Sequence, residues 1–235
     1  MRELTEISFV NHKRFAAFSR KPLRSFPVRP TPLTEQPDWH HLPRLEPDLY
    51  RSFAVVQWTI TLKHRAAGWL DDIFHLRFRE LLLHAFAREG LFCPVYVLMP
   101  DHMHLVWMGL RVSSDQRNAM KFLRKHRAME LTQRSPTGVE FELQKQAHDS
   151  VLRDKDRTRG AFEISCFYLL DNPRRKNLVE HPHEYPYLGA IVPGYPFLHP
   201  LSGDFWEMFW KIYTEQREPT PTSLTASRQN TGHEE

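Results

Sequence analysis

The sequence predicts an α+β domain in which a four-stranded antiparallel sheet carries helices on one face. The chain has 235 residues, which suits one elaborated domain. Hydrophobic residues make up 41% and charged residues 26%, enough to form a core and to exclude global disorder. Strand-like and helix-like segments follow one another in the order βαββαβ, and a further helical segment comes after them. This order is typical of the ferredoxin-like sandwich.

The first two elements have clear local signals. Residues 53–62 are rich in β-branched and aromatic side chains, which favours a strand. Asp71 and Asp72 offer an N-cap to an apolar pattern of helical spacing that Gly90 closes. The other predicted elements are strands over 95–99 and 103–110 separated by Pro100-Asp101, a helix capped by Ser113 or Ser114 that runs to about 133, a weak strand near 150–152 and a helix over about 157–170.

The two ends of the chain differ from this middle. Residues 1–48 hold seven prolines and predict an extended arm, while residues 218–235 are rich in Ser, Thr and Pro and predict a disordered tail. The domain is therefore expected over 49–217, with an aromatic C-terminal helix near 205–210. Two distant cysteines and no signal-peptide pattern favour a cytoplasmic protein. Prolines interrupt the uncharged run over 186–203, so no membrane span is expected.

Positive charge is concentrated in the middle of the chain. The formal net charge is +4, but residues 111–176 alone carry +6 and the rest of the chain carries −2. A local positive excess fits a polyanionic partner such as nucleic acid.

Two histidines lie in the second strand of the predicted hairpin. His102 and His104 flank Met103, and side chains of a strand alternate between its faces, so both imidazoles point the same way and could chelate one metal. A half-buried polar pair would have the same pattern. His181 and His183 repeat the spacing, which makes the spacing alone a weak signal.

Tyr168 and Asn172 form a second candidate pair. They are four residues apart near the end of a predicted helix, so they share one face about 6 Å apart along the axis. Pro173 disfavours α conformation at Asn172 and predicts a helix end or kink there. A tyrosine at a helix end is also a common core residue.

Three segments together resemble one family. The block 96–106, Tyr-Val-Leu-Met-Pro-Asp-His-Met-His-Leu-Val, resembles the His-hydrophobic-His motif of the single-tyrosine HUH transposases. Residues 168–179 are similar to that family's catalytic-tyrosine segment, and 148–153 resemble a block between the two. The order and spacing, over about residues 50–190, are those of the REP-associated tyrosine transposases. The sequence departs from the family pattern at two places. The family often has Asn where this chain has Asp101, and Val-Arg-Ala-Gly where this chain has residues 174–177.

The resemblance implies a metal-dependent enzyme that cuts and rejoins single-stranded, hairpin-forming DNA. It implies Tyr168 as the nucleophile of a 5′-phosphotyrosine intermediate, and His102, His104 and Asn172 as ligands of Mg²⁺ or Mn²⁺. Gln144 or His148 could replace Asn172 as the third ligand. Family members act as monomers or homodimers.

DNA contacts are expected from the central basic region. The candidates are Arg117, Lys121, Arg124, Lys125, Arg153, Arg157, Arg159, Arg174 and Arg175. Each of them could also belong to a merely solvated surface.

Two alternatives use the same residues differently. The first is a catalytically silent nucleic-acid-binding module on the same fold. The second is a metal hydrolase in which the histidine pair activates water and Tyr168 only packs.

Overall fold

The computed structural model describes residues 45–135 and 140–219. Five strands form one antiparallel sheet in the order β4-β1-β3-β2-β5. The strands are β1 (Val55–Thr61), β2 (Leu91–Met99), β3 (His102–Gly109), β4 (His148–Val151) and β5 (Leu188–Ile191). The helices are α1 (Asp72–Glu89), α2 (Gln116–Arg134), α3 (Arg159–Leu170), α4 (Asn172–Arg175) and α5 (Phe205–Gln216). Short 3-10 turns span Pro47–Tyr50 (η1), Lys63–Arg65 (η2), Asp154–Arg157 (η3) and Pro182–Glu184 (η4).

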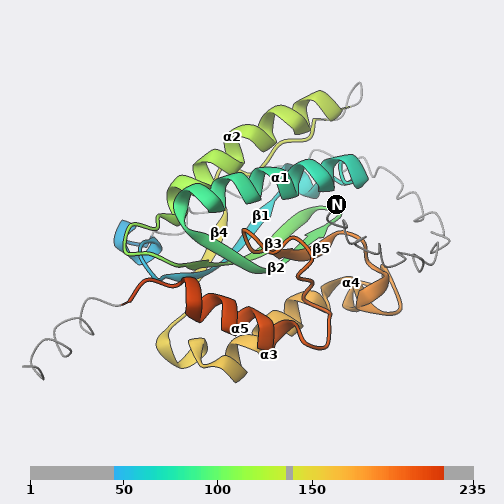
Figure 1. Cartoon of the computed structure of the whole chain (residues 1–235). Helices are drawn as coiled ribbons and strands as arrows, with labels where there is room; N and C mark the ends of the chain where they lie inside the picture. The colour runs from blue at the N-terminus through green and yellow to red at the C-terminus, as the bar shows by residue number, and fades with distance from the viewer. Residues whose placement is uncertain (1–44, 136–139, 220–235) are drawn as a thin grey trace, which may run out of the picture.

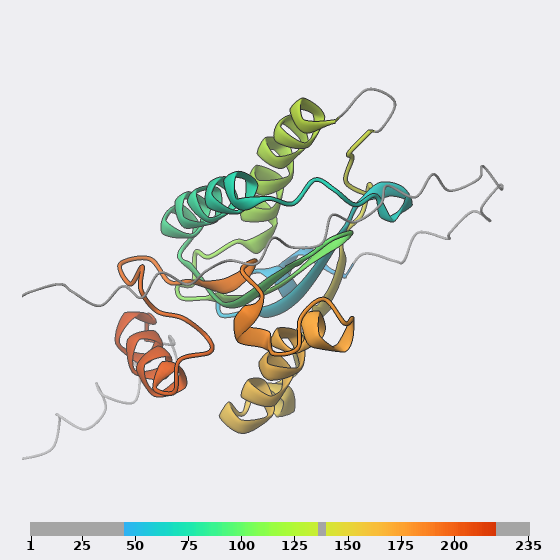
Figure 2. The same ribbon diagram turned by 90° about the vertical axis from the view of Figure 1, so that its right-hand side faces the viewer.

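The elements form three layers (Figure 1). Helices α1 and α2 cover one face of the sheet, and α3 and α5 lie against the other. Figure 2 shows the same layers from the side, with the sheet between the two groups of helices. We call the two faces the α1 face and the α3 face. None of the helices in the described parts of the chain is long and apolar enough to span a membrane.

The predicted α+β class and βαββαβ order are confirmed, but the strand count is wrong. The first four strands take the order β4-β1-β3-β2, and β5 adds a fifth strand beside β2. All four residues of β5 are buried. A four-residue strand buried on both faces has no polar alternation, so nothing in the proline-rich run over 186–203 distinguished it from a loop.

Capping explains where α1 and α2 begin and end. Asp71 accepts a 2.7 Å hydrogen bond from the backbone N–H of Phe74, and Gly90 ends α1 in the left-handed region at φ 64°, as predicted. The predicted serine cap of α2 is wrong, because Asp115 caps that helix instead. Ser114 is fully buried and donates to the carbonyl of Gly90 at 2.7 Å, so its hydroxyl joins two loops.

The third predicted helix begins later than expected. Residues 154–157 form the 3-10 turn η3, and α3 starts at Arg159. It ends at Leu170, and α4 follows after Asp171, so the chain breaks its helix just before Pro173 as predicted.

The predicted ends fall mostly outside the described residues. Of the arm over 1–48, only residues 45–48 are described, and Pro47 begins the turn η1. Of the tail over 218–235, Glu218 is described and is tied to the domain, because its carboxylate accepts a 2.9 Å hydrogen bond from the N–H of Val112. The disorder expected for the rest of the tail lies outside the described residues.

Candidate functional site

The two histidines of β3 face the α3 side of the sheet. Trp107 of the same strand packs edge-on against Phe86 of α1, with ring centroids 5.1 Å apart. Because side chains alternate along a strand, His102 and His104 point to the opposite face from Trp107. The predicted shared orientation of the two imidazoles is therefore present, on the side of the sheet where α3 lies.

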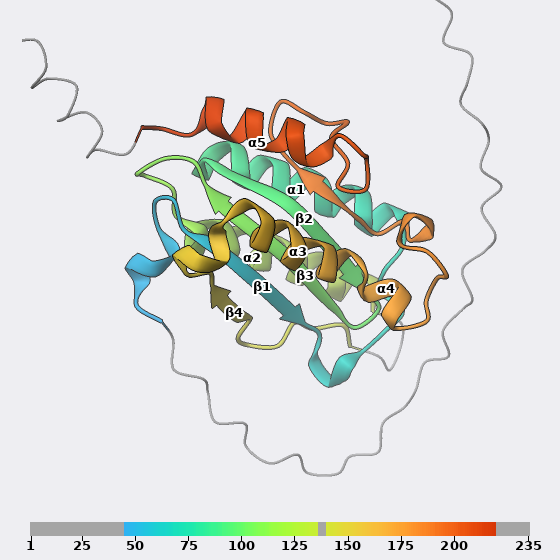
Figure 3. The same cartoon turned by 90° about the horizontal axis from the view of Figure 1, so that it is seen from below.

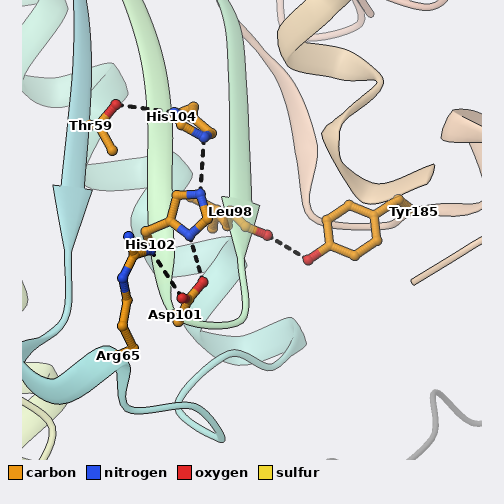
Figure 4. Close-up of polar contacts among 7 residues, drawn as sticks. All are labelled: Thr59, Arg65, Leu98, Asp101, His102, His104 and Tyr185. Carbon is orange, nitrogen blue, oxygen red and sulfur yellow. Dashed lines mark hydrogen bonds and ion pairs between the residues drawn. The ribbon is translucent and has the colours of Figure 1, made fainter. Parts of the chain in front are cut away.

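The two imidazoles meet through their Nε2 atoms, which are 2.9 Å apart (Figure 4). The ring planes are nearly perpendicular, at 89°, with centroids 4.6 Å apart. The second pair, His181 and His183, is different: its rings are stacked and almost parallel, at 6°. Only the β3 pair directs two ring nitrogens at each other.

The outer nitrogens of both rings have partners. Nδ1 of His102 donates to a carboxylate oxygen of Asp101 at 2.5 Å, and Nδ1 of His104 lies 3.1 Å from the hydroxyl of Thr59. A carboxylate only accepts, so a neutral His102 carries its proton on Nδ1 and presents a lone pair at Nε2. A hydroxyl can donate or accept, so Thr59 allows either tautomer of His104. The 2.9 Å contact between the two Nε2 atoms is therefore an N–H···N hydrogen bond, and a cation held by both lone pairs would replace its proton.

The electrostatics keep this pair ready to bind a cation. Burial, and secondarily the neighbouring His102, lowers the pKa of His104 from 6.5 to about 4, so this ring is neutral at pH 7. Burial raises the pKa of Asp101, but hydrogen bonds and charges from His102 and Arg65 outweigh it and lower that pKa. A neutral imidazole beside an imidazole that is bonded to a carboxylate is a usual arrangement of metal-binding histidines.

The pair fits a divalent cation in distance as well as chemistry. Two neighbouring ligands of an octahedral ion at roughly 2.1 Å are about 3 Å apart, close to the observed 2.9 Å. Across residues 45–135 and 140–219, no cluster of three or more His, Cys, Asp or Glu side chains surrounds the pair. Amide, water or substrate oxygens would have to complete the coordination.

Tyr168 and Asn172 stand at the junction of α3 and α4. The Tyr168 side chain is 57% exposed, so it is not part of the core. The Arg175 guanidinium lies 3.9 Å from the centroid of its ring and also donates to Oδ1 of Asn172 at 3.3 Å. Among the contacts of the described residues, none joins Tyr168 or Asn172 to the histidine pair.

Tyr168 lies on a different side of α3 from the flank that contacts α5. Glu163 of α3 accepts a 2.7 Å hydrogen bond from Trp210 of α5, and Phe167 packs on Trp206 with centroids 5.9 Å apart, so this flank of α3 faces α5. Tyr168 lies one residue, about 100°, further round the helix. Seen from below, α3 crosses the sheet and leaves β1 and β4 without a covering helix (Figure 3).

This uncovered part of the sheet is polar. Thr59 pairs with His104 on one side and with His148 on the other, so the three side chains form a row on the α3 face. Gln57 and Ser150 form the next pair on the same face, and His148 and Ser150 are exposed. Of the two residues considered as an alternative third ligand, His148 belongs to this row. Gln144 lies before β4 and does not.

The segment after α4 is tied to the end of the sheet that carries the histidines. The hydroxyl of Tyr185 donates to the carbonyl of Leu98 at 2.6 Å (Figure 4), and the N–H of Leu98 donates to the carbonyl of Tyr187 at 2.8 Å. Leu98 lies three residues before Asp101. These bonds hold the chain that follows Tyr168 and Asn172 against the strand that leads into the histidine pair.

The basic residues singled out from the sequence lie on two sides of the sheet. Four of them, Arg117, Lys121, Arg124 and Lys125, belong to α2 on the α1 face, away from the histidines. Arg124 donates to the carbonyls of Gln144 and Lys145. The other five, Arg153, Arg157, Arg159, Arg174 and Arg175, lie between the end of β4 and α4. The basic residues that lie in the middle of the sequence are therefore divided between two sides of the sheet in the structure.

Several of these arginines already have partners. Arg174 makes two 2.7 Å hydrogen bonds to the carboxylate of Asp171, and Nε of Arg157 donates to the carbonyl of Leu152 at 2.8 Å. The Arg159 guanidinium lies 5.3 Å from the Trp210 ring. Arg175 is the one in contact with Tyr168.

Sequence reasoning missed three residues of this site. Thr59, Arg65 and Asp101 all contact the histidine pair or its partners. Asp101 is adjacent to His102, a signal that was available. Thr59 lies in β1, and the β1–β3 register places it opposite His104. Arg65 lies in the turn η2 after β1 and reaches the site through its hydrogen bond to Asp101.

Comparison with solved structures gives a remote structural similarity. No protein-family model matches the chain, and no curated protein matches it. A solved structure described as a REP-associated tyrosine transposase bound to a REP hairpin is similar, with a TM-score of 0.47 and 16% sequence identity. The match covers 64% of this chain and 82% of that one.

Proposed function

We propose that this protein is a metal-dependent endonuclease and strand-transferase that acts on single-stranded, hairpin-forming DNA. The observation that carries the proposal is the pair of Nε2 atoms of His102 and His104, 2.9 Å apart on the same side of the sheet as the exposed Tyr168. The resemblance of the segments around these residues to the REP-associated tyrosine transposases supports it.

The roles follow from the chemistry of each side chain. His102 and His104 would hold Mg²⁺ or Mn²⁺ through Nε2, and Asn172 is proposed as the third ligand through Oδ1. That oxygen now accepts from Arg175, so binding a cation would replace this hydrogen bond. When bound, the cation would neutralise charge on the scissile phosphate and polarise it.

Tyr168 is the proposed nucleophile. Its Oη attacks the phosphorus of the scissile phosphodiester, the bond from phosphorus to the 3′-oxygen breaks, and the phenolic proton passes to solvent while the leaving 3′-oxygen takes one up. The 5′-phosphate stays bonded to Tyr168, and a second 3′-hydroxyl can attack it and reverse the step. Strand joining therefore needs no external energy source.

The exposed Tyr168 and the uncovered polar part of the sheet favour an unpaired strand as substrate. The backbone of a single strand can bend to bring one phosphate between a helix and a sheet, which a stacked duplex resists. Arg175, next to Tyr168, is suited to contact a phosphate of that strand.

One assay tests the proposal. Labelled single-stranded hairpin DNA is incubated with the protein and Mg²⁺ or Mn²⁺, and a DNA–protein adduct is sought after denaturation in detergent. We expect an adduct with the wild type and with Tyr195→Phe, a tyrosine outside the site, and none with Tyr168→Phe. His102→Ala should lower the yield by orders of magnitude, while His181→Ala, from the second histidine pair, should not.

The other outcomes separate the alternatives. DNA binding with neither adduct nor cleavage would indicate a silent binding module. Cleavage that persists in Tyr168→Phe would indicate a hydrolase that uses activated water, and would refute the role of Tyr168.

A further inference from the structure

The carboxylate of Asp101 is shared between two side chains from different parts of the chain. One oxygen accepts from Nδ1 of His102 at 2.5 Å, and the other accepts from Nη1 of Arg65 at 3.1 Å (Figure 4). We propose that Arg65 and Asp101 are positioning residues that fix His102 in the tautomer able to bind a cation. This inference rests on the cation site of the proposed function.

The two histidines are not equivalent. Asp101 leaves His102 only one neutral tautomer, with its lone pair at Nε2, because a carboxylate cannot donate to Nδ1. Thr59 imposes no such choice on His104. Without a cation, His104 donates its Nε2 proton to His102 and accepts from Thr59. With a cation, His104 carries its proton on Nδ1 and donates to Thr59. His102 is therefore the ligand prepared in advance, and His104 is the one that adapts.

Arg65 is placed on Asp101 by an uncommon backbone. His64 and Arg65 both have φ of 54°, a left-handed conformation that residues other than glycine seldom adopt. Such backbone persists only where surrounding contacts enforce it, and it is concentrated at functional sites. Here the N–H of Leu62 donates to the carbonyl of Asp101 at 3.1 Å, and the N–H of Lys63 donates to the carbonyl of Glu142 at 2.7 Å. These bonds fix both ends of the Arg65–Asp101 contact.

The chemical consequence is a stronger ligand. An imidazole that donates to a carboxylate is more basic at its other nitrogen and cannot rotate away from it. Arg65 holds that carboxylate in place through its 3.1 Å hydrogen bond. Loss of such an outer partner typically weakens metal binding by about 10–100-fold.

The test measures cation binding and tautomer state in the full chain. Mn²⁺ binding is followed by electron paramagnetic resonance, and the protonated ring nitrogen of His102 is identified by long-range ¹H–¹⁵N NMR without metal. The variants are Asp101→Ala, Asp101→Asn and Arg65→Gln. Asp48→Asn is the matched control, because Asp48 pairs with Arg51 away from the site.

We expect Asp101→Ala to weaken Mn²⁺ binding by about 10–100-fold and to let His102 populate the Nε2-protonated tautomer. Asp101→Asn has the same shape but only one acceptor oxygen, so with that oxygen on Arg65 its amide N–H donates to Nδ1 of His102. The Nε2-protonated tautomer of His102 should gain population and Mn²⁺ affinity should fall. Arg65→Gln should lower Mn²⁺ affinity a few-fold, and Asp48→Asn should leave it unchanged. Because Asp101→Asn is isosteric, it decides the question if Asp101→Ala fails to fold.

Two results would overturn the inference: Mn²⁺ affinity of both Asp101 variants within two-fold of the wild type, or a wild-type His102 that carries its proton on Nε2. The proposed function fails in a different way. If His102→Ala binds Mn²⁺ as the wild type does, there is no cation site at this pair, and the tautomer measurement still decides whether Asp101 fixes His102.

Discussion

Arg175 covers the ring of Tyr168, with its guanidinium carbon 3.9 Å from the ring centroid. The tyrosine side chain is more than half exposed, and the guanidinium lies over its ring. The same guanidinium donates to Asn172. A single basic side chain thus links the two residues proposed to act on the DNA from the α3 side.

Removing this contact should slow adduct formation. A cation–π contact at an exposed site contributes roughly 0.5–1 kcal/mol, so Arg175→Ala should lower the rate by about 2–5-fold at saturating DNA. Arg175→Lys keeps the charge, so its rate of adduct formation should lie between those of the wild type and Arg175→Ala. Single-turnover adduct assays at saturating DNA measure this without a contribution from binding. An unchanged rate in Arg175→Ala would show that the contact does not orient Tyr168.

The basic residues of α2 should not affect the chemical step. Lys121 and Lys125 are exposed on the α1 side of the sheet, away from His102 and Tyr168. We expect the double variant Lys121→Ala/Lys125→Ala to form the adduct at the wild-type rate at saturating DNA. Binding titrations at several salt concentrations show whether α2 contacts DNA at all, since each lost phosphate contact lowers the slope by about 0.7–0.9. A large loss in single-turnover rate would contradict this arrangement.

Protonation of His104 should destabilise the fold in acid. Its pKa is about 4 in the folded protein and 6.5 when unperturbed, so between these values the unfolded chain binds more protons. The stabilisation is complete above pH 6.5 and is lost as the pH falls to about 4. It amounts to about 2–3 kcal/mol.

His104→Gln isolates this contribution. His75 also has a pKa of about 4, because burial and Arg79 lower it, but it is retained in both proteins. The fall in free energy of unfolding from pH 7 to pH 4 should therefore be smaller in His104→Gln by about 2–3 kcal/mol, as measured by urea denaturation. Equal falls in both proteins would mean that His104 is protonated at the same pH folded and unfolded.

The buried arginine of α2 is predicted to stabilise the α1–α2 layer. The side chain of Arg127 is completely buried, lies 4.8 Å from the Phe74 ring centroid and forms an ion pair with Glu130 at 2.6 Å. Burial lowers its pKa to about 10, so it stays charged at neutral pH. Arg127→Met leaves Glu130 without this partner and should cost about 2–4 kcal/mol.

The double variant Arg127→Met/Glu130→Gln should recover at least half of that loss, because no uncompensated buried charge remains. Urea denaturation measures the free energy of unfolding of the single and the double variant. If the double variant is no more stable than the single one, the loss comes from packing against Phe74 and Phe78 rather than from charge.

Local patterns predicted most of the fold. The caps of α1 at Asp71 and Gly90, the Pro100-Asp101 turn and the helix break before Pro173 are all short-range signals, and the structure has each of them. The errors concern features fixed by distant residues. The fifth strand exists because it pairs with β2, and Ser114 is a buried link rather than a cap because Gly90 lies beside it.

The sequence alone determined that His102 and His104 point the same way, because strand side chains alternate with a period of two residues. It also determined that Tyr168 and Asn172 share a helix face at a helix end, because four residues make about one turn. Only the tertiary structure decided which layer of helices the histidines face, which outer partners set their tautomers, and that the α2 basic residues lie on the opposite side. Those relationships depend on strand register and layer packing, in which Thr59 and Arg65 meet residues about 40 positions away.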